Sequence, residues 1–169
     1  MKKNSGFTLI ELVITVALVA IVMAIGVPSM TNFVKNDRLT TQINTLVAHL
    51  AYARSEAVLK VQPVIVCASS NASSCSSNNW ADGWIVFVDT DLNSDFSAGE
   101  TMLRVQQPLN GGNTLVSSTG SIVTYDRRGF APNSSGSFAL CDDRGAAHIK
   151  SITISNTGRV RKGGSSACS

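Results

Sequence analysis

The chain has 169 residues, which is room for one globular domain and an appendage. Its composition, with 44% hydrophobic and 15% charged residues, is ordinary for a soluble fold. The formal net charge of +3 falls almost to zero without residues 1–6, because Lys2 and Lys3 leave and 12 basic side chains then face 11 acidic ones. Overall charge therefore singles out no class of partner. No G-x-S-x-G motif, phosphate loop or recognisable nucleophile–histidine spacing is present, so we expect neither an enzyme nor a cofactor; a hydrolase is the most remote alternative.

The N-terminal segment is one apolar run. Phe7 to Val27 is 21 residues long, with Thr8, Glu11 and Thr15 as its only polar members. A helix of that length spans about 30 Å, the thickness of a bilayer core, and the basic flank at Lys2-Lys3 would keep the N-terminus cytoplasmic. A secretory signal peptide would be cleaved after the run, where the sequence offers no good small-x-small site.

Glu11 is the unusual residue of this run. A carboxylate inside an apolar helix costs several kcal/mol unless it is paired, so it indicates a specific partner. If the chain is cut after Gly6, the new amino group of Phe7 lies about one helical turn from Glu11 on the same face. The amine and the carboxylate can then neutralise each other, within a chain or between neighbouring chains.

The segment from Gly6 to Leu12 resembles the class III signal of type IV pilins and type II secretion pseudopilins. The resemblance implies a prepilin peptidase that cuts between Gly6 and Phe7 and methylates Phe7, with Glu11 as the assembly glutamate. It also implies other pilins as partners. The subunit would cross the inner membrane once with its head in the periplasm, and later join a pilus or pseudopilus.

The second part of the helix is amphipathic. Gly26 and Pro28 are predicted to interrupt the helix and kink it. Apolar residues then recur at helical spacing until Gln62-Pro63, so one face of this part should be buried against a sheet. The expected parts are a leader peptide (1–6), a membrane and filament-core half of the helix (7–28), an amphipathic half (29–62) and a β-rich head with a basic tail (63–169).

Short β runs follow the helix, separated by Gly, Asn and Ser clusters at spacings typical of antiparallel sheets. The expected strands are Val64–Cys67, Trp84–Val88, Met102–Val105, Ile122–Tyr125, Phe138–Cys141, His148–Ile154 and Arg159–Arg161. The fold class is therefore α+β: a long N-terminal α-helix docked on an antiparallel β-sandwich-like head.

Four cysteines in a small exported domain favour two disulfides. Of the three possible pairings we favour Cys67–Cys75, which closes a Ser/Asn-rich loop, and Cys141–Cys168, which holds the C-terminal tail.

An acidic segment, Asp89 to Glu100, matches most of a twelve-residue calcium loop. Oxygen-bearing side chains stand at its positions 1, 3, 5, 7 and 12. However, Ser94 replaces the glycine of position 6, and a strand precedes the loop instead of a helix. We therefore assign no metal from the sequence, and a calcium-regulated module stays an alternative to an acidic turn.

The last part of the chain is basic, because Arg144, Lys150, Arg159, Arg161 and Lys162 follow one another with no acid after Arg144. If the end is extended, alternation places Arg159 and Arg161 on one face, where two guanidiniums can bind successive phosphates. A second basic pair, Arg127-Arg128, is interpreted as a turn between strands.

The motifs Gly83-Trp84-Ile85-Val86-Phe87-Val88-Asp89 and Gly158-Arg159-Val160-Arg161 are similar to those of the FimT/GspH group of minor pilins and pseudopilins. Some FimT-type members bind DNA during natural transformation through a C-terminal Gly-Arg-x-Arg motif. The resemblance implies a minor pilin that binds double-stranded DNA without sequence specificity through Arg159, Arg161 and Lys162, supported by Lys150 and Arg144. The alternative is a GspH-like minor pseudopilin with a structural or assembly role.

Overall fold

The structure is a computed structural model that describes residues 6–164 and 167–168. The basic flank Lys2-Lys3 and the rest of the leader before Gly6 lie outside the described residues. The chain forms two compact units, Met1–Asp37 and Arg38–Ser169. A single helix, α1 (Leu9–Lys60), contributes to both of them.

The N-terminal unit is an exposed apolar helix. Every residue from Gly6 to Val34 is exposed, and α1 is the one described helix long and apolar enough to cross a membrane. Contrary to our expectation, Gly26 and Pro28 do not interrupt it. A proline removes only the hydrogen bond from its own nitrogen to the carbonyl four residues earlier, and the helix ladder continues on both sides of Pro28.

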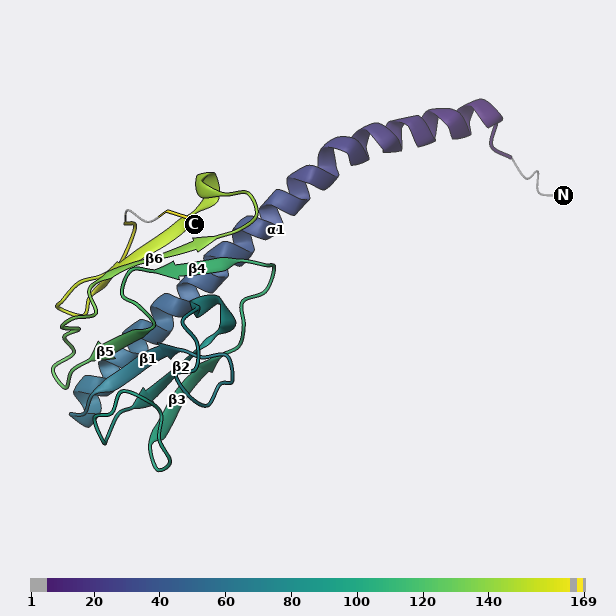
Figure 1. Cartoon of the computed structure of the whole chain (residues 1–169). Helices are drawn as coiled ribbons and strands as arrows, with labels where there is room; N and C mark the ends of the chain where they lie inside the picture. Colours follow the sequence, from purple (N-terminus) through teal and green to yellow (C-terminus); the bar gives the residue numbers. More distant parts are fainter. Residues whose placement is uncertain (1–5, 165–166, 169) are drawn as a thin grey trace. The chain divides into compact units, whose positions relative to one another are not determined.

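The second unit contains two antiparallel sheets, as the sequence predicted (Figure 1). In the first sheet the strand order is β3 (Thr101–Gln106), β2 (Trp84–Val88), β1 (Val64–Ala68) and β5 (Ile122–Tyr125). In the second sheet the order is β4 (Thr114–Ser117), β6 (Gly136–Cys141), β7 (Lys150–Ile154) and β8 (Val160–Lys162). The fold-class prediction, one long helix with a two-sheet β head, is confirmed.

Two strand predictions are wrong in detail. Strand β4 was not among the expected strands: it has four residues, of which only Leu115 is buried, so its apolar pattern is short. His148 does not begin a strand: it ends a 3₁₀ turn, Ala146–His148, and β7 starts at Lys150. Gly145 precedes this turn with φ +77°, a conformation that starts a turn more readily than a strand.

The main core lies between the C-terminal part of α1 and the sheets. Its helical residues recur every three or four positions, as an amphipathic helix requires: Leu39, Ile43, Leu46, Leu50, Ala53 and Ala57. Trp80 and Phe138 meet edge to face with ring centroids 4.9 Å apart, which joins the turn before β2 to the second sheet. The Trp84 indole donates to Nδ1 of His49 at 3.0 Å, and burial, with the nearby charge of Arg104, lowers the pKa of His49.

A smaller core covers the other face of the first sheet. It contains Ile65, Cys67, Ile85 and Phe87, with Phe96 packed against Phe87 at 5.5 Å between ring centroids. Strands β1 and β2 are therefore buried on both faces, which explains their uninterrupted apolar sequences.

Both favoured disulfides are present in the structure. Cys67–Cys75 joins β1 to the Ser/Asn-rich loop, with Cα atoms 5.5 Å apart. Cys141–Cys168 joins the end of β6 to the C-terminal segment, with Cα atoms 5.9 Å apart. Cys67–Cys75 restrains a loop that has few buried side chains of its own.

Candidate functional site

The basic end of the chain is built on a tight turn between β7 and β8. The Gly158 N–H donates to the Ser155 carbonyl at 2.8 Å, and the Ser155 N–H donates to the Arg159 carbonyl at 3.1 Å. Gly158 has φ +73°, and a Cβ there would overlap the carbonyl oxygen of Gly129. The glycine of the Gly-Arg-x-Arg motif is thus required by the packing of two turns, and the arginines after it remain exposed.

The cations of this end do not all share one face. Strand β8 begins at Val160, which packs on the main core, so Arg159 lies in the turn before the strand. Within β8 the partners are Thr153 for Arg161 and Ile152 for Lys162, which places the last two side chains on opposite faces.

Lys162 lies instead with Lys150. Both line a hollow of about 310 Å³ beside Thr40 and Asn44 of α1. Lys150 is two residues before the buried Ile152, which places it on the same face of the second sheet as Lys162. The structure therefore brings Lys150 and Lys162 together, whereas Arg159 lies in the turn before β8 and Arg161 lies on the opposite face of that strand from Lys162.

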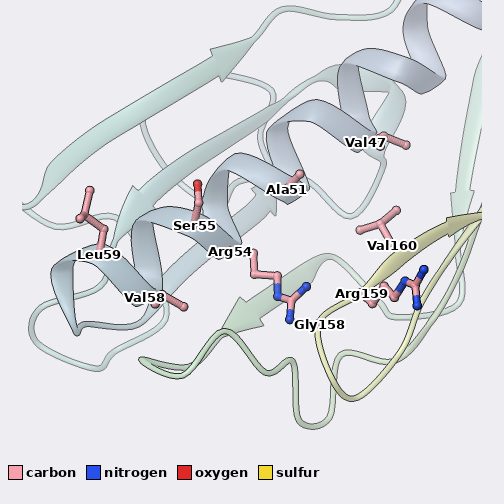
Figure 2. Close-up of a pocket in the computed structure, with 9 residues that line it drawn as sticks. All are labelled: Val47, Ala51, Arg54, Ser55, Val58, Leu59, Gly158, Arg159 and Val160. Atoms are coloured by element: carbon pink, nitrogen blue, oxygen red, sulfur yellow. The ribbon is translucent and has the colours of Figure 1, made fainter.

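Arg159 lies at the border of an apolar groove of about 760 Å³ (Figure 2). One wall is the surface of α1 and the other is the turn before β8. The lining residues are Val47, Ala51, Arg54, Ser55, Val58, Leu59, Gly158, Arg159 and Val160. Among these lining residues Arg54 and Arg159 are charged, and the others offer no charge to a ligand.

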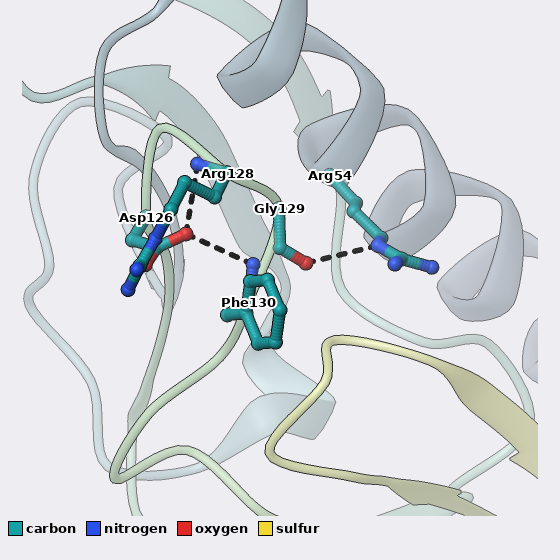
Figure 3. Close-up of polar contacts among 5 residues, drawn as sticks. All are labelled: Arg54, Asp126, Arg128, Gly129 and Phe130. Atoms are coloured by element: carbon teal, nitrogen blue, oxygen red, sulfur yellow. Dashed lines mark hydrogen bonds and ion pairs between the residues drawn. The ribbon is translucent and has the colours of Figure 1, made fainter.

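The second basic pair forms a turn, as the sequence predicted. The Gly129 N–H donates to the Asp126 carbonyl at 2.8 Å, and Arg54 donates to the Gly129 carbonyl at 2.9 Å (Figure 3). Partial burial opposes ionisation of Asp126, but hydrogen bonds from the Phe130 amide and from Arg128 hold its pKa below the ordinary value. The Arg128 guanidinium, 2.9 Å from Asp126, is consequently already paired.

The Arg144 side chain is likewise already paired with a carboxylate, and it is mostly buried. Its guanidinium donates two hydrogen bonds to one carboxylate oxygen of Asp142, at 2.6 and 2.9 Å, and only 13% of the side chain is exposed. The hydrogen bond from Arg144 is also the main reason that the pKa of Asp142 lies below its ordinary value. The structure does not place Arg144 with the exposed cations. The Asp-x-Arg spacing of residues 142–144 is a sequence signal for such a local pair.

The processing residues lie at the start of the described chain. Gly6 and Phe7 precede the helix and are exposed, and the hydroxyl of Thr8 accepts a hydrogen bond from the Glu11 amide at 3.3 Å. This contact caps the helix, which begins at Leu9. Glu11 therefore lies in the first turn of α1, where the helix dipole favours a negative charge.

Comparison with known proteins places this architecture among the pilins. The structure resembles the type IV minor pilin FimU of Pseudomonas aeruginosa, with a TM-score of 0.63, 22% identity, and coverage of 78% of this chain and 92% of FimU. It also resembles the minor pseudopilin EpsH of the Vibrio cholerae type 2 secretion system, with a TM-score of 0.54, 12% identity, and coverage of 74% and 95%. At these identities the likeness is one of fold.

Sequence similarity gives the family. Residues 42–158 match the family described as Type II transport protein GspH, and residues 1–27 match the prokaryotic N-terminal methylation motif. The chain belongs to the GspH family, within the superfamily of type IV minor pilins and pseudopilins. A curated relative, prepilin peptidase-dependent protein D of Escherichia coli K12, is 41% identical over 49 residues, which is 29% of this chain and 34% of that protein. The chain thus matches about one third of that relative's length.

Proposed function

We propose that this chain is a filament subunit processed by a prepilin peptidase between Gly6 and Phe7. The methylation-motif match and the name of the Escherichia coli relative support this, as does the exposed apolar surface of the first unit. Before assembly the helix would hold the subunit in the inner membrane with the head in the periplasm. In the filament the same surface would pack against other pilins, with Glu11 paired to an amine.

The processing proposal has a direct test. Mass spectrometry of the mature N-terminal peptide should find Phe7 as the first residue, one methyl group heavier than the unmodified peptide. The same measurement in cells that lack the peptidase should find the uncut leader. A mature chain that begins after Val27 would mean an ordinary signal peptide and would contradict the proposal.

We further propose that the head binds double-stranded DNA without sequence specificity, as a FimT-type minor pilin. The observation that carries this is that β7, β8 and the turn between them contribute four exposed cations: Arg159, Arg161, Lys150 and Lys162. Arginine binds phosphate bidentately and lysine acts as a point charge, so the four groups suit the DNA backbone rather than base edges. Arg144 is left out because its charge is neutralised by Asp142.

Replacing both Arg159 and Arg161 with glutamine should weaken DNA binding. Full-length chain in neutral detergent would be titrated into a labelled DNA duplex from 50 to 200 mM NaCl, with fluorescence anisotropy as the readout. If four side chains contact phosphates, the logarithm of the binding constant should fall against the logarithm of the salt concentration with a slope of about −4. The double variant loses two of these contacts, so its slope should be about −2.

The neighbouring turn offers a matched control. Arg127→Gln/Arg128→Gln removes the same charge, but Arg128 is already paired with Asp126, so its salt slope should change by less than that of the test variant. Equal losses in both double variants would mean that net charge alone matters, and the site assignment would fail. Equally negligible binding by all three proteins would reject DNA binding altogether.

The second candidate is a GspH-like pseudopilin with a structural role. The observation in its favour is the apolar groove along α1, where Val58 and Leu59 are exposed next to the turn at Gly158. Such a surface suits contact with another protein rather than with a polyanion. If the DNA titration shows no binding, this assembly role is the function that the geometry supports.

A further inference from the structure

The hairpin between β2 and β3 gathers three carboxylates at its end. Val88 and Thr101 are register partners, so Asp89 and Glu100, the residues that follow and precede them, are brought side by side. One oxygen each from Asp89, Asp91 and Glu100 lies within 4.8 Å of the others. Asp89 is 3% exposed, Glu100 is half-buried and Asp91 is exposed. Strand pairing thus joins the first and last residues of the acidic loop without any flanking helix.

Asp89 has a buried oxygen without a partner. Its Oδ2 accepts a hydrogen bond from the Ser94 amide at 3.3 Å, whereas its Oδ1 is buried and has no hydrogen-bond partner among the described residues. An anionic oxygen enclosed in this way is destabilising unless a cation or a donor reaches it.

The other two carboxylates are held in place around this oxygen. Glu100 Oε1 accepts from the Thr90 amide at 2.7 Å, and its Oε2 accepts from the Ser97 amide at 3.0 Å. Asp91 accepts from the backbone and the side chain of Asn93 at 3.1 and 2.8 Å. These hydrogen bonds orient the carboxylates but leave their charges without any counter-charge from an ion pair in residues 6–164 and 167–168.

We propose that the loop from Asp89 to Glu100 binds one calcium ion, with Asp89, Asp91 and Glu100 as its carboxylate ligands. Calcium takes six to eight oxygen ligands in flexible geometry, whereas zinc prefers nitrogen or sulfur and magnesium demands a strict octahedron. The loop offers oxygens only, and water and backbone carbonyls can complete the shell. This inference replaces the metal-free assignment made from the sequence.

Ser94, which weakened the sequence match, does not obstruct the loop. It adopts φ +65°, the left-handed conformation for which a glycine is preferred at that position. The Asp95 carboxylate is used elsewhere, because it accepts a hydrogen bond from the Cys75 amide at 2.9 Å. Asp95 is therefore not counted among the calcium ligands, although it belongs to the same acidic loop. A substitution of Asp95 can serve as a control for substitutions of the proposed ligands.

Calcium binding should be measurable on the full-length chain in neutral detergent after removal of divalent ions with a chelator. Isothermal titration with CaCl2 should show one ion per chain and a Kd of about 10⁻⁴–10⁻³ M, the range of extracellular calcium modules. The thermal midpoint of the head should rise with calcium concentration, because the ion binds only the folded loop.

Single substitutions distinguish a ligand set from a general acidic surface. Asp89→Asn and Glu100→Gln should each weaken calcium binding at least about tenfold. Asp95→Asn removes the same charge from the same loop but not a ligand, so its Kd should change by less than about threefold. Glu100→Gln is the second test in case Asp89→Asn does not fold, with circular dichroism as the check on folding.

Three outcomes would overturn the proposal. The first is the absence of saturable binding at millimolar calcium. The second is an equal loss of affinity in all three variants, which would indicate unspecific attraction to negative charge. The third is magnesium binding as tightly as calcium, which would mean that the loop does not select by size and coordination number. None of these results depends on whether the head binds DNA.

Discussion

Gly158→Ala is expected to destabilise the head by about 2–4 kcal/mol. Part of the loss is conformational, because φ +73° costs an alanine about 1–2 kcal/mol. The rest comes from overlap of the new methyl group with the carbonyl oxygen of Gly129. Both atoms are held by the backbone, so the turns at Gly129 and Gly158 must move apart. The Ala131 amide donates to the Asn156 carbonyl at 2.9 Å between these turns and resists that movement.

Urea unfolding of a soluble form that begins at Met30 would measure this loss, since every buried residue of the described chain lies from Leu39 onward. Gly112→Ala is the matched control: Gly112 has φ +67°, and a Cβ there meets no atom within 4 Å. It should lose only about 1–2 kcal/mol. Equal losses in the two variants would show that the contact with Gly129 does not hold the turn before Arg159.

Trp80→Ala is expected to cost about 3–5 kcal/mol in the same unfolding measurement. Trp80 is 1% exposed and its ring packs edge to face on Phe138 of the second sheet. Its indole N–H also donates to the Gly120 carbonyl at 2.8 Å, in the turn that precedes β5. Removing the ring therefore leaves a large cavity where the two sheets meet and an unpaired carbonyl beside it.

Trp80→Phe separates these two effects. Phenylalanine keeps an aromatic ring against Phe138 but cannot donate to Gly120, so this variant should lose about 1–3 kcal/mol, the cost of an unpaired polar group. If Trp80→Phe were as unstable as Trp80→Ala, the indole N–H and the extra volume of the indole would matter more than the aromatic contact with Phe138. If both variants were as stable as the unchanged chain, Trp80 would not join the sheets.

Sequence alone locates the elements whose apolar pattern is long or unbroken. Strands β2 and β5 have the predicted bounds, since the buried Trp84–Val88 is apolar throughout and Ile122–Tyr125 is framed by turn residues. The disulfide pairing that the sequence favoured among three possibilities is also the one in the structure. In contrast, β4 is specified mainly by its pairing with β6, a contact between distant segments that no local pattern reports.

The candidate sites show the same division between local and distant information. The arginines of the Gly-Arg-x-Arg motif are visible in the sequence, but their separation from Lys150 and Lys162 depends on where β8 begins and on its register with β7. The acidic loop is likewise visible, but the sequence does not show that Asp89 Oδ1 is buried without a partner. The hairpin that places Asp89 beside Glu100 depends on the pairing of β2 with β3, which no local pattern reports.

The exposed apolar surface between Phe7 and Val34 has a consequence for how a subunit leaves the membrane. Lipid chains are about as apolar as leucine, so moving this surface from a bilayer into a bundle of similar helices gains little hydrophobic free energy. The free energy of helix association must therefore come from close packing and from polar pairs such as the one proposed for Glu11. Each interhelical hydrogen bond is worth only about 1–2 kcal/mol. For the filament subunit proposed above, extraction from the membrane and return to it would therefore be nearly balanced in free energy.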